Sequence, residues 1–528
     1  MDIGIRISSF NNIKLVNLKT SNKKNIGLIS FILIYVIFIV LIFLWLFLDH
    51  GLPHWDMGRH LFNVLQYRDA WKEFTNGQRN IFGVAVLYLY YPPLIYQIGL
   101  AFFVIFGASA KAAIATNIVW ILILFFSVYQ ISWRIYKNQL IALTAVIFLG
   151  ASPILIGQVR EFQVDLPLTA MIALSLWLIL RTEQFSKLVP SILFGAIAGL
   201  SMLTKWTYAF YLLPLIIIYF GYSIIMAKKK IPVLINLIYA ALVSILIAGY
   251  WYFTNRASLR ADFSQNGVAV AKLEGDPTGI NLTSLTWYLK RILDNYLFLP
   301  LFIIYLAGLL WALIKKEWRK KLALILILTP IYYLIFSILP NKDTRYLMPL
   351  IPLLAITGVC AFNISKNKYY QIGLVVLLVA IFFINNLNIA FSKNLNWQSN
   401  NIYLFGNQYL PVYSNNGYTT NSPRTENCPI DKVMESIPEG SSVRLIGPNL
   451  IDYNNWMVAF YAGKTQKIWA GEQEYFMNSN YLIFRNQDVD QENMTTELKN
   501  SAKIKLINTY NCANGGRVEL YKNTTIPN

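Results

Sequence analysis

Four short polar stretches of the chain carry carboxylates, lysine or arginine, and each adjoins a long apolar run. The residues in them with the greatest chemical potential are Asp56, Asp165, Lys205, Asp343 and Arg345. A carboxylate can accept the proton of an attacking hydroxyl or hold a divalent cation, and lysine and arginine can neutralise a phosphate. This combination predicts transfer of a group from a lipid phosphate to an acceptor at a membrane surface.

Each of these residues also has a structural explanation. Asp165 can cap a helix that has Pro167 in its first turn, and Lys205 can extend its amine toward the membrane surface. Asp343 and Arg345 can form an ordinary loop ion pair that contributes little. Ionisable residues near membrane depth are costly and tend to mark function, so their shared position beside apolar runs favours a site.

The composition is that of a membrane protein. The chain has 528 residues, of which 56% are hydrophobic, and several apolar runs are about as long as a bilayer is thick. The net charge of +19 is spread over short basic clusters between these runs. Membrane topology requires such clusters, so nucleic-acid binding is not expected.

The apolar runs predict about eleven transmembrane helices. They lie near residues 27–48, 112–133, 139–157, 166–180, 188–203, 207–226, 232–253, 296–314, 322–339, 346–363 and 370–391. A further run, Pro92–Phe106, is short, and the positive-inside rule holds for the later clusters only if it does not cross. The N-terminus is then cytoplasmic, the C-terminus is outside, and all five candidate residues face outward.

This topology predicts a polytopic α-helical membrane protein with a soluble C-terminal domain. Its parts are a basic cytoplasmic tail (1–26), a transmembrane module (27–391) with an outer loop (49–111), and an extracytoplasmic domain (392–528). Thr254–Asn295 is expected to be a long outer loop that can act as a lid. The small residues of Gly195–Gly199 predict close helix packing.

The C-terminal domain is expected to be α/β or α+β, because apolar runs in it are short and rich in β-formers. We expect strands at Ser442–Ile446, Trp456–Tyr461, Tyr481–Phe484, Ile504–Asn508 and Arg517–Tyr521, and a helix at Ile430–Ser436. Cys428 and Cys512 both lie in this domain and can form a disulfide if the compartment is oxidising.

Five motifs occur along the chain in a characteristic order. They are His54-Trp55-Asp56, Tyr91-Pro92-Pro93-Leu94, Phe162-Gln163-Val164-Asp165-Leu166-Pro167, Leu203-Thr204-Lys205-Trp206 and Lys342-Asp343-Thr344-Arg345-Tyr346. This order resembles the GT-C superfamily of integral-membrane glycosyltransferases. Within it, the chain is similar to bacterial relatives of protein O-mannosyltransferases and lipid A aminoarabinose transferases. The resemblance covers roughly residues 25–395 and also implies a non-spanning helix in the first outer loop.

The resemblance implies a hexose or pentose donor on a polyprenyl phosphate and an inverting transfer. The acceptor would be a hydroxyl on a glycan, lipid or protein outside the bacterial inner membrane. Asp56 would be the general base, and Asp165 would orient the sugar or acceptor. Lys205, Arg345 and Arg59 would bind the donor phosphate.

The remaining expectations concern substrate contacts and a metal. Substrate-binding candidates are His54, His60, Tyr91, Arg160 and Asp343. Asp56 and Asp165 can share a magnesium or manganese ion, or the reaction can need no cofactor. Some relatives have a glutamate just before the loop proline, where this chain has Tyr90 and Tyr91, so a required metal is less expected. Zinc does not fit, because no cysteine joins the two histidines and Asp56.

Two other functional classes compete with glycosyl transfer. A transporter of a lipid or sugar would have ionisable residues within its spans, or broken helices in matching halves. The charges here gather at one face, and no internal repeat is evident. A non-catalytic surface-binding protein would need far fewer spans as an anchor.

Overall fold

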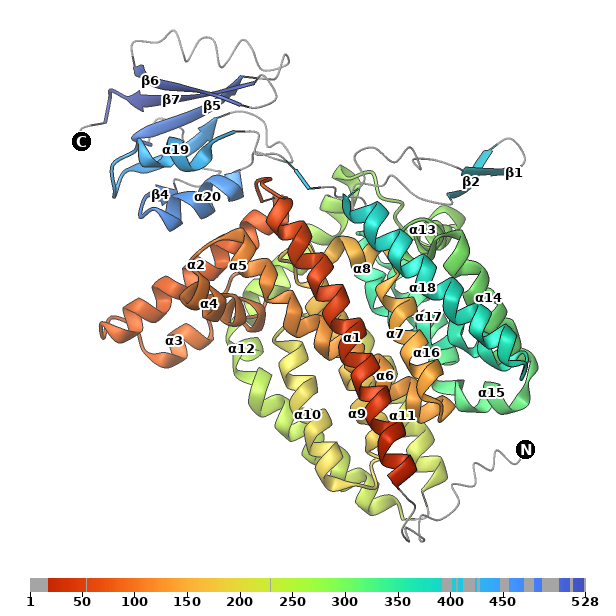
Figure 1. The fold of residues 1–528 in the computed structure, drawn as a ribbon. Helices are drawn as coiled ribbons and strands as arrows, with labels where there is room; N and C mark the ends of the chain where they lie inside the picture. Colours follow the sequence, from red (N-terminus) through yellow and green to blue (C-terminus); the bar gives the residue numbers. More distant parts are fainter. Residues whose placement is uncertain are drawn as a thin grey trace.

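The structure is a computed structural model that describes residues 18–53, 55–227, 229–391, 401–404, 407–411, 423–424, 428–446, 455–469, 479–486, 503–512 and 516–526. Most of the predicted tail, His54 and the predicted domain boundary at residue 392 lie outside these residues. Figure 1 shows a helical bundle with a small sheet domain over one end. Helix α1 (Leu18–Leu48) begins at the opposite end of the bundle and ends beneath this domain.

The other helices of the bundle follow in chain order. They are α2 (Trp55–Thr75), α3 (Ile81–Ala85), α4 (Leu94–Phe106), α5 (Ala110–Ala115), α6 (Asn117–Tyr136), α7 (Gln139–Gly150), α8 (Pro153–Gln158), α9 (Asp165–Arg181), α10 (Leu188–Met202), α11 (Tyr208–Met226), α12 (Lys230–Leu273), α13 (Leu282–Arg291), η1 (Ile292–Leu297), α14 (Phe298–Ile314), α15 (Lys316–Lys321), α16 (Ala323–Ile338), η2 (Thr344–Leu350), α17 (Ile351–Gly358), η3 (Val359–Asn363) and α18 (Lys368–Phe391). η1 is a π-helix, and η2 and η3 are 3-10 helices.

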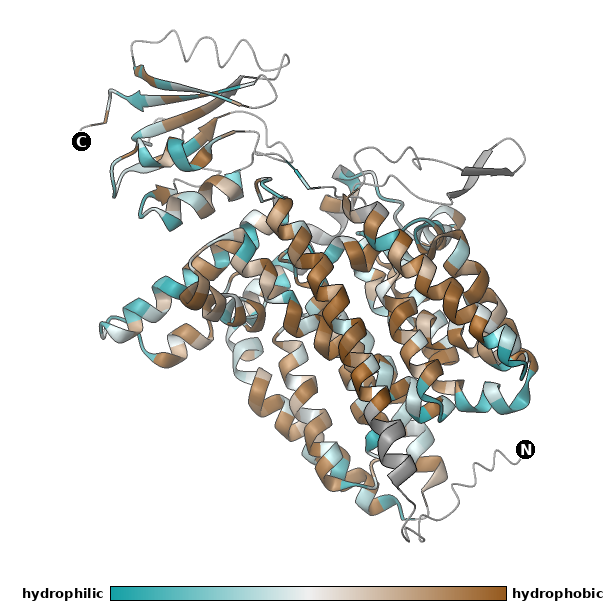
Figure 2. Cartoon of the chain, viewed as in Figure 1, coloured by the Kyte–Doolittle hydropathy of each residue, from teal (hydrophilic) through white to brown (hydrophobic). Residues whose placement is uncertain are grey.

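Among the described residues, seven helical segments are long and apolar enough to cross a membrane. They are Ile26–Leu48, Ala110–Tyr136, Tyr208–Met226, Lys230–Asp262, Leu282–Ile314, Thr344–Asn363 and Lys368–Leu387. Four apolar helices are shorter: Leu94–Phe106, Gln139–Gly150, Leu188–Met202 and Ala323–Ile338. Figure 2 shows the hydrophobic residues along the length of the bundle. The chain is therefore a multi-pass α-helical membrane protein, as the sequence predicted, while the total of eleven spans stays a prediction.

Helices α10 and α12 pack with their backbones in close approach. A Cβ atom on Gly195 would lie 2.2 Å from the carbonyl oxygen of Ala240, and one on Gly199 would lie 2.9 Å from that of Ser244. Both distances are too short for a side chain, so only glycine permits this packing. The prediction from the small residues is confirmed.

The predicted loop Thr254–Asn295 is wrong, because most of it is helical. Helix α12 continues to Leu273, and α13 and η1 follow it after a short turn. Strong helix formers such as Ala257 and Ala261 follow the apolar run, and no proline occurs between the end of that run and Pro277. Helix α12 therefore continues past the end of the apolar run. The sequence analysis had placed the end of the helix where the apolar run ends.

The C-terminal domain contains a five-stranded sheet in the order β4-β3-β5-β7-β6. The strands are β3 (Ser442–Ile446), β4 (Ile468–Trp469), β5 (Tyr481–Asn486), β6 (Ile504–Asn511) and β7 (Arg517–Asn523). β3 pairs in parallel with β4 and β5, whereas β7 pairs antiparallel with β5 and β6. A disulfide joins Cys428 to Cys512, as the sequence allowed. Strands β1 (Asn401–Leu404) and β2 (Asn407–Pro411) form a separate hairpin away from this sheet (Figure 1).

Helix α19 (Ile430–Glu435) matches the predicted helix, but the predicted strand Trp456–Tyr461 is wrong. This segment belongs to helix α20 (Asn455–Lys464), in which Met457 through Phe460 are all buried. A short apolar run that is buried on every side has no periodicity, so its pattern does not separate helix from strand.

Candidate functional site

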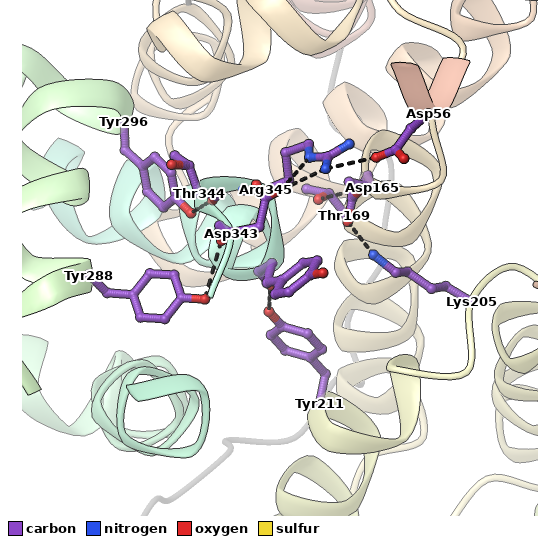
Figure 3. A network of polar contacts seen from close by, with 11 residues as sticks. Asp56, Asp165, Thr169, Lys205, Tyr211, Tyr288, Tyr296, Asp343, Thr344 and Arg345 are labelled. Carbon is purple, nitrogen blue, oxygen red and sulfur yellow. Dashed lines mark hydrogen bonds and ion pairs between the residues drawn. The ribbon is translucent and has the colours of Figure 1, made fainter. Parts of the chain in front are cut away.

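Four separate segments bring the five principal candidate residues together. Asp56 lies in the first turn of α2, and Asp165 is the first residue of α9. Lys205 lies in the turn between α10 and α11, and Asp343 and Arg345 lie at the start of η2. Figure 3 shows their side chains grouped in one polar network.

Arg345 is the central cation of this network. Its Nε and Nη2 atoms donate to Oδ2 of Asp343 at 3.0 and 2.6 Å, and Nη2 also donates to Oδ2 of Asp56 at 3.0 Å. The backbone N–H of Arg345 donates to the other oxygen of Asp343 at 2.8 Å. The side chains of Arg345 and Asp343 are largely buried, whereas that of Asp56 is 40% exposed. Asp343 thus fixes the guanidinium of Arg345, and the carboxylate of Asp56 remains accessible to solvent.

The local charges keep Asp56 ionised. Burial alone would raise the pKa of its carboxyl, but the charge and hydrogen bond of Arg345, together with the charge of Arg59, outweigh this effect. The pKa of Asp56 is therefore lowered. At neutral pH this residue is a carboxylate that can accept a proton or a hydrogen bond.

Lys205 and Asp165 form a second, buried ion pair. Nζ of Lys205 lies 2.6 Å from Oδ1 of Asp165, and each side chain is only 2% exposed. The lysine also lies 4.9 Å from the ring centroid of Tyr346 and 5.5 Å from that of Tyr91. Asp165 opens helix α9, where the helix dipole favours a negative charge. The pair fixes the amine of Lys205 between two aromatic rings.

Three tyrosines that the sequence analysis did not select hold the backbone of η2. The hydroxyl of Tyr288 donates to the carbonyl of Asp343 at 3.2 Å. Those of Tyr296 and Tyr211 donate to the carbonyls of Thr344 and Tyr346 (Figure 3). For Tyr211 and Tyr296 the available signal was their position in apolar runs, because a buried tyrosine hydroxyl needs a partner. Tyr288 lies in the segment that was expected to be a loop.

Lys342 belongs to the same motif as Asp343 and Arg345, but its side chain points away from the site. Nζ of Lys342 donates to the carbonyls of Ser337 and Leu339, both at 2.8 Å, and so satisfies the end of α16. Its backbone N–H donates to the carboxylate of Asp276 at 2.7 Å. Lys342 therefore supports the fold of this turn.

Arg59 lies one helical turn after Asp56 and is held by aromatic rings. Its guanidinium carbon is 5.0 Å from the ring centroid of Tyr90 and 5.1 Å from that of Trp456. Tyr90 has a φ of 70°, an uncommon conformation for a residue other than glycine. The cation contacts both the loop between α3 and α4 and the C-terminal domain.

Two other predicted substrate contacts, His60 and Arg160, are buried. His60 is buried, its Nδ1 lies 3.0 Å from the hydroxyl of Tyr96, and burial lowers its pKa to about 3. It is therefore neutral at pH 7. Arg160 is also buried, 5.2 Å from the ring centroid of Trp45, in a cluster with Asp49. Neither side chain is therefore exposed to solvent.

Glu161 is a further carboxylate near Arg345, and the sequence analysis did not select it. Burial raises the pKa of Glu161, although the charges of Arg345 and Arg424 oppose this effect. Its carboxylate accepts a long hydrogen bond of 3.4 Å from Gln163. The neighbouring Arg160 was the more conspicuous residue of this segment, and the sequence held no signal that Glu161 lies near Arg345 and Arg424.

The carboxylates fit a resident divalent cation poorly. Asp165 faces the amine of Lys205 and Asp56 faces the guanidinium of Arg345, so each already has a positive partner. Over the part of the chain that the structure describes, no group of three or more histidine, cysteine, aspartate or glutamate residues could hold a metal ion.

Comparisons with known proteins identify related sequences and folds. Residues 91–251 match the family model described as dolichyl-phosphate-mannose-protein mannosyltransferase. An uncharacterized protein of Aquifex aeolicus (strain VF5) is 29% identical over 259 residues, which cover 47% of this chain and 48% of that protein. The chain thus matches about half the length of this relative. The matched family region includes Tyr91, Asp165 and Lys205 and does not extend to Asp56 or Arg345.

Two solved structures have the same fold. Both are of ArnT from Cupriavidus metallidurans. The apo structure has a TM-score of 0.59 and 14% identity, covering 94% of this chain and 99% of that chain. The structure bound to undecaprenyl phosphate has a TM-score of 0.50 and 16% identity, covering 69% and 66%. In its fold, and in the sequence of residues 91–251, the chain therefore resembles the GT-C glycosyltransferases.

Proposed function

We propose that the protein is a glycosyltransferase that moves a sugar from a polyprenyl-phosphate donor to an acceptor hydroxyl, with inversion of the anomeric centre. The observation that carries this proposal is the accessible, ionised carboxylate of Asp56 held beside the guanidinium of Arg345. Lys205 and Arg59 place two more cations nearby. The family match, and the binding of undecaprenyl phosphate by ArnT, support a lipid-phosphate donor.

The chemistry is a single displacement. Asp56 takes the proton of the acceptor hydroxyl while the acceptor oxygen attacks the anomeric carbon of the sugar. The bond from that carbon to the phosphate oxygen breaks, and its electron pair stays on the polyprenyl phosphate. Attack from the face opposite the leaving group inverts the centre. Arg345, Lys205 and Arg59 stabilise the negative charge on the departing phosphate.

The remaining residues of the site position these groups. Asp343 orients Arg345 through two oxygens, and Asp165 holds the amine of Lys205. Tyr91 lies against Lys205 and provides an aromatic face for the sugar or its phosphate. His60 is buried and neutral, and it supports the aromatic face of Tyr91 from the protein interior.

The pairing of each carboxylate with a side-chain cation favours a mechanism that needs no metal. A magnesium or manganese ion shared by Asp56 and Asp165 would have to displace Lys205 and Arg345 from them. The acceptor is a glycan, a lipid or a protein hydroxyl outside the bacterial inner membrane, on the side of the C-terminal domain.

The test is transfer by the purified full-length protein from a panel of radiolabelled polyprenyl-phosphate sugars to crude membrane acceptors. Wild type and Asp56→Asn are compared, each with and without EDTA. We expect labelled product from wild type only, and no effect of EDTA. Equal product from both proteins would exclude Asp56 as the base. Loss of product with EDTA would show that the reaction needs a metal ion. If a folded wild type neither transferred nor bound any lipid-linked sugar, transport would become the better hypothesis.

A further inference from the structure

The C-terminal domain touches the candidate site through helix α20. A Cβ atom on Gly58 would lie 2.8 Å from the backbone nitrogen of Met457, so α2 and α20 meet at a point where only glycine fits. About three turns further along α2, Arg68 donates to the carbonyl of Gly463 at 3.2 Å and secures the same pair of helices. This contact begins two residues after Asp56, the proposed base.

Trp456 brings an aromatic ring from this domain onto Arg59. The guanidinium lies between the rings of Trp456 and Tyr90, about equally distant from both. The indole of Trp456 is itself supported by Trp469, with ring centroids 4.9 Å apart, and by Phe62 at 6.2 Å. Tyr90 belongs to the bundle, so two separate parts of the chain hold one cation.

The hydrogen-bonding capacity of Arg59 remains available for a ligand. In the described residues, no carboxylate lies within ion-pair distance of its guanidinium, in contrast to Arg345 and Lys205. Stacking covers the faces of a guanidinium and leaves the N–H groups at its edge free to bind a phosphate. Arg59 follows Asp56 by three residues and therefore shares its face of α2.

We propose that Trp456 is a positioning residue for donor binding, which makes the C-terminal domain a part of the donor phosphate site. Trp456 holds Arg59 against Tyr90 and so directs the guanidinium edge toward the phosphate of the lipid-linked donor. This inference rests on the proposed function, because it takes that donor as the ligand. It assigns to the extracytoplasmic domain a share in forming the site itself, in addition to any role in recognising the acceptor.

The test measures the affinity of the full-length protein in lipid nanodiscs for undecaprenyl phosphate. We expect Trp456→Ala to weaken binding about 3- to 30-fold, the range for loss of a cation–π contact. Trp456→Phe should recover most of the affinity, because it keeps an aromatic face. Arg59→Ala should weaken binding at least as much, and the double variant should bind no more weakly than Arg59→Ala alone.

Phe460→Leu is the matched control, because Phe460 lies on the same helix but packs on Phe103, with centroids 6.2 Å apart. It should bind as wild type does. If Trp456→Ala fails to fold, Tyr90→Asn removes the other ring while tolerating the positive φ, and should weaken binding similarly. Wild-type affinity in Trp456→Ala, or additive losses in the double variant, would overturn the inference. Absence of binding by folded wild type would instead overturn the proposed donor, and this inference with it.

Discussion

Arg345 donates from the same nitrogen to Asp343, two residues before it, and to Asp56, 289 residues before it. The first contact is set by the local fold of η2, and the second joins η2 to the first turn of α2. One guanidinium therefore ties the proposed general base to a backbone segment that three tyrosine hydroxyls hold in place. The position of Asp56 therefore depends on the contacts that hold η2 in place.

Asp343→Asn should reduce transfer without abolishing lipid binding. Asparagine keeps the shape of the side chain but loses the charge that holds Arg345, and a hydrogen bond to a charged group contributes about 1.5–3 kcal/mol. We expect kcat to fall about 10- to 100-fold in the radiolabel transfer assay. Asp276→Asn is the control, because an amide oxygen can still accept the N–H of Lys342. Equal activities of the two variants would contradict the positioning role of Asp343.

The pH profile of transfer should show its acid limb at unusually low pH. The pKa of Asp56 is lowered in the folded protein, so its carboxylate stays ionised below the pH at which a free aspartate is protonated. The initial rate should therefore hold constant from neutral pH downward and decline only at a pH below the range in which a free aspartate is protonated. In Arg345→Gln the opposing charge is lost and burial dominates, so the limb should move to higher pH. A wild-type limb centred near neutrality would mean that another group titrates.

Much of the bundle was predictable because lipid imposes a simple pattern on the sequence. Runs of apolar residues predicted its long apolar helices, and Gly195 and Gly199 identified the contact between α10 and α12. Residues outside the apolar layer gave weaker signals. The extension of α12 to Leu273 depends on helix propensity and on contacts such as that of Asn255 with the carbonyl of Val86. A loop and an exposed helix have similar compositions there.

From the sequence, the site residues could be predicted only to lie on the same face of the membrane. Sequence order and charge placed Asp56, Asp165 and Arg345 on that face, but not the pairing of each carboxylate with its cation. The orientations of Lys342 and Arg160 were also beyond reach, because a long side chain can turn either toward the site or away from it. Pairings between distant segments depend on tertiary packing, which one sequence does not encode in any local pattern.

The Cys428–Cys512 disulfide should stabilise the C-terminal domain strongly. It links positions 84 residues apart, and closing a loop of that length in the unfolded chain corresponds to about 4.6 kcal/mol. The double variant Cys428→Ser/Cys512→Ser should therefore lower the melting temperature of this domain, followed by near-ultraviolet circular dichroism. Cys360→Ser is the control, since that buried cysteine is free. An unchanged transition in the double variant would show that the bridge contributes little to folding.

The buried pair of Lys205 and Asp165 allows stability and catalysis to be separated. Lys205→Met leaves the carboxylate of Asp165 buried without its partner, which costs about 3–5 kcal/mol for a broken buried pair. Its melting temperature should fall well below that of wild type. Asp165→Leu/Lys205→Met replaces both charges by apolar groups of similar size and should recover most of this loss.

Transfer should stay low in both variants, because neither has the amine that would stabilise the departing phosphate. The measurements are a thermal melt in nanodiscs and the radiolabel transfer assay on the same preparations. Recovery of activity together with stability would mean that the pair serves only the fold. A double variant that is stable but inactive would place Lys205 in the chemistry, since the shape of the site would then be intact without its charge.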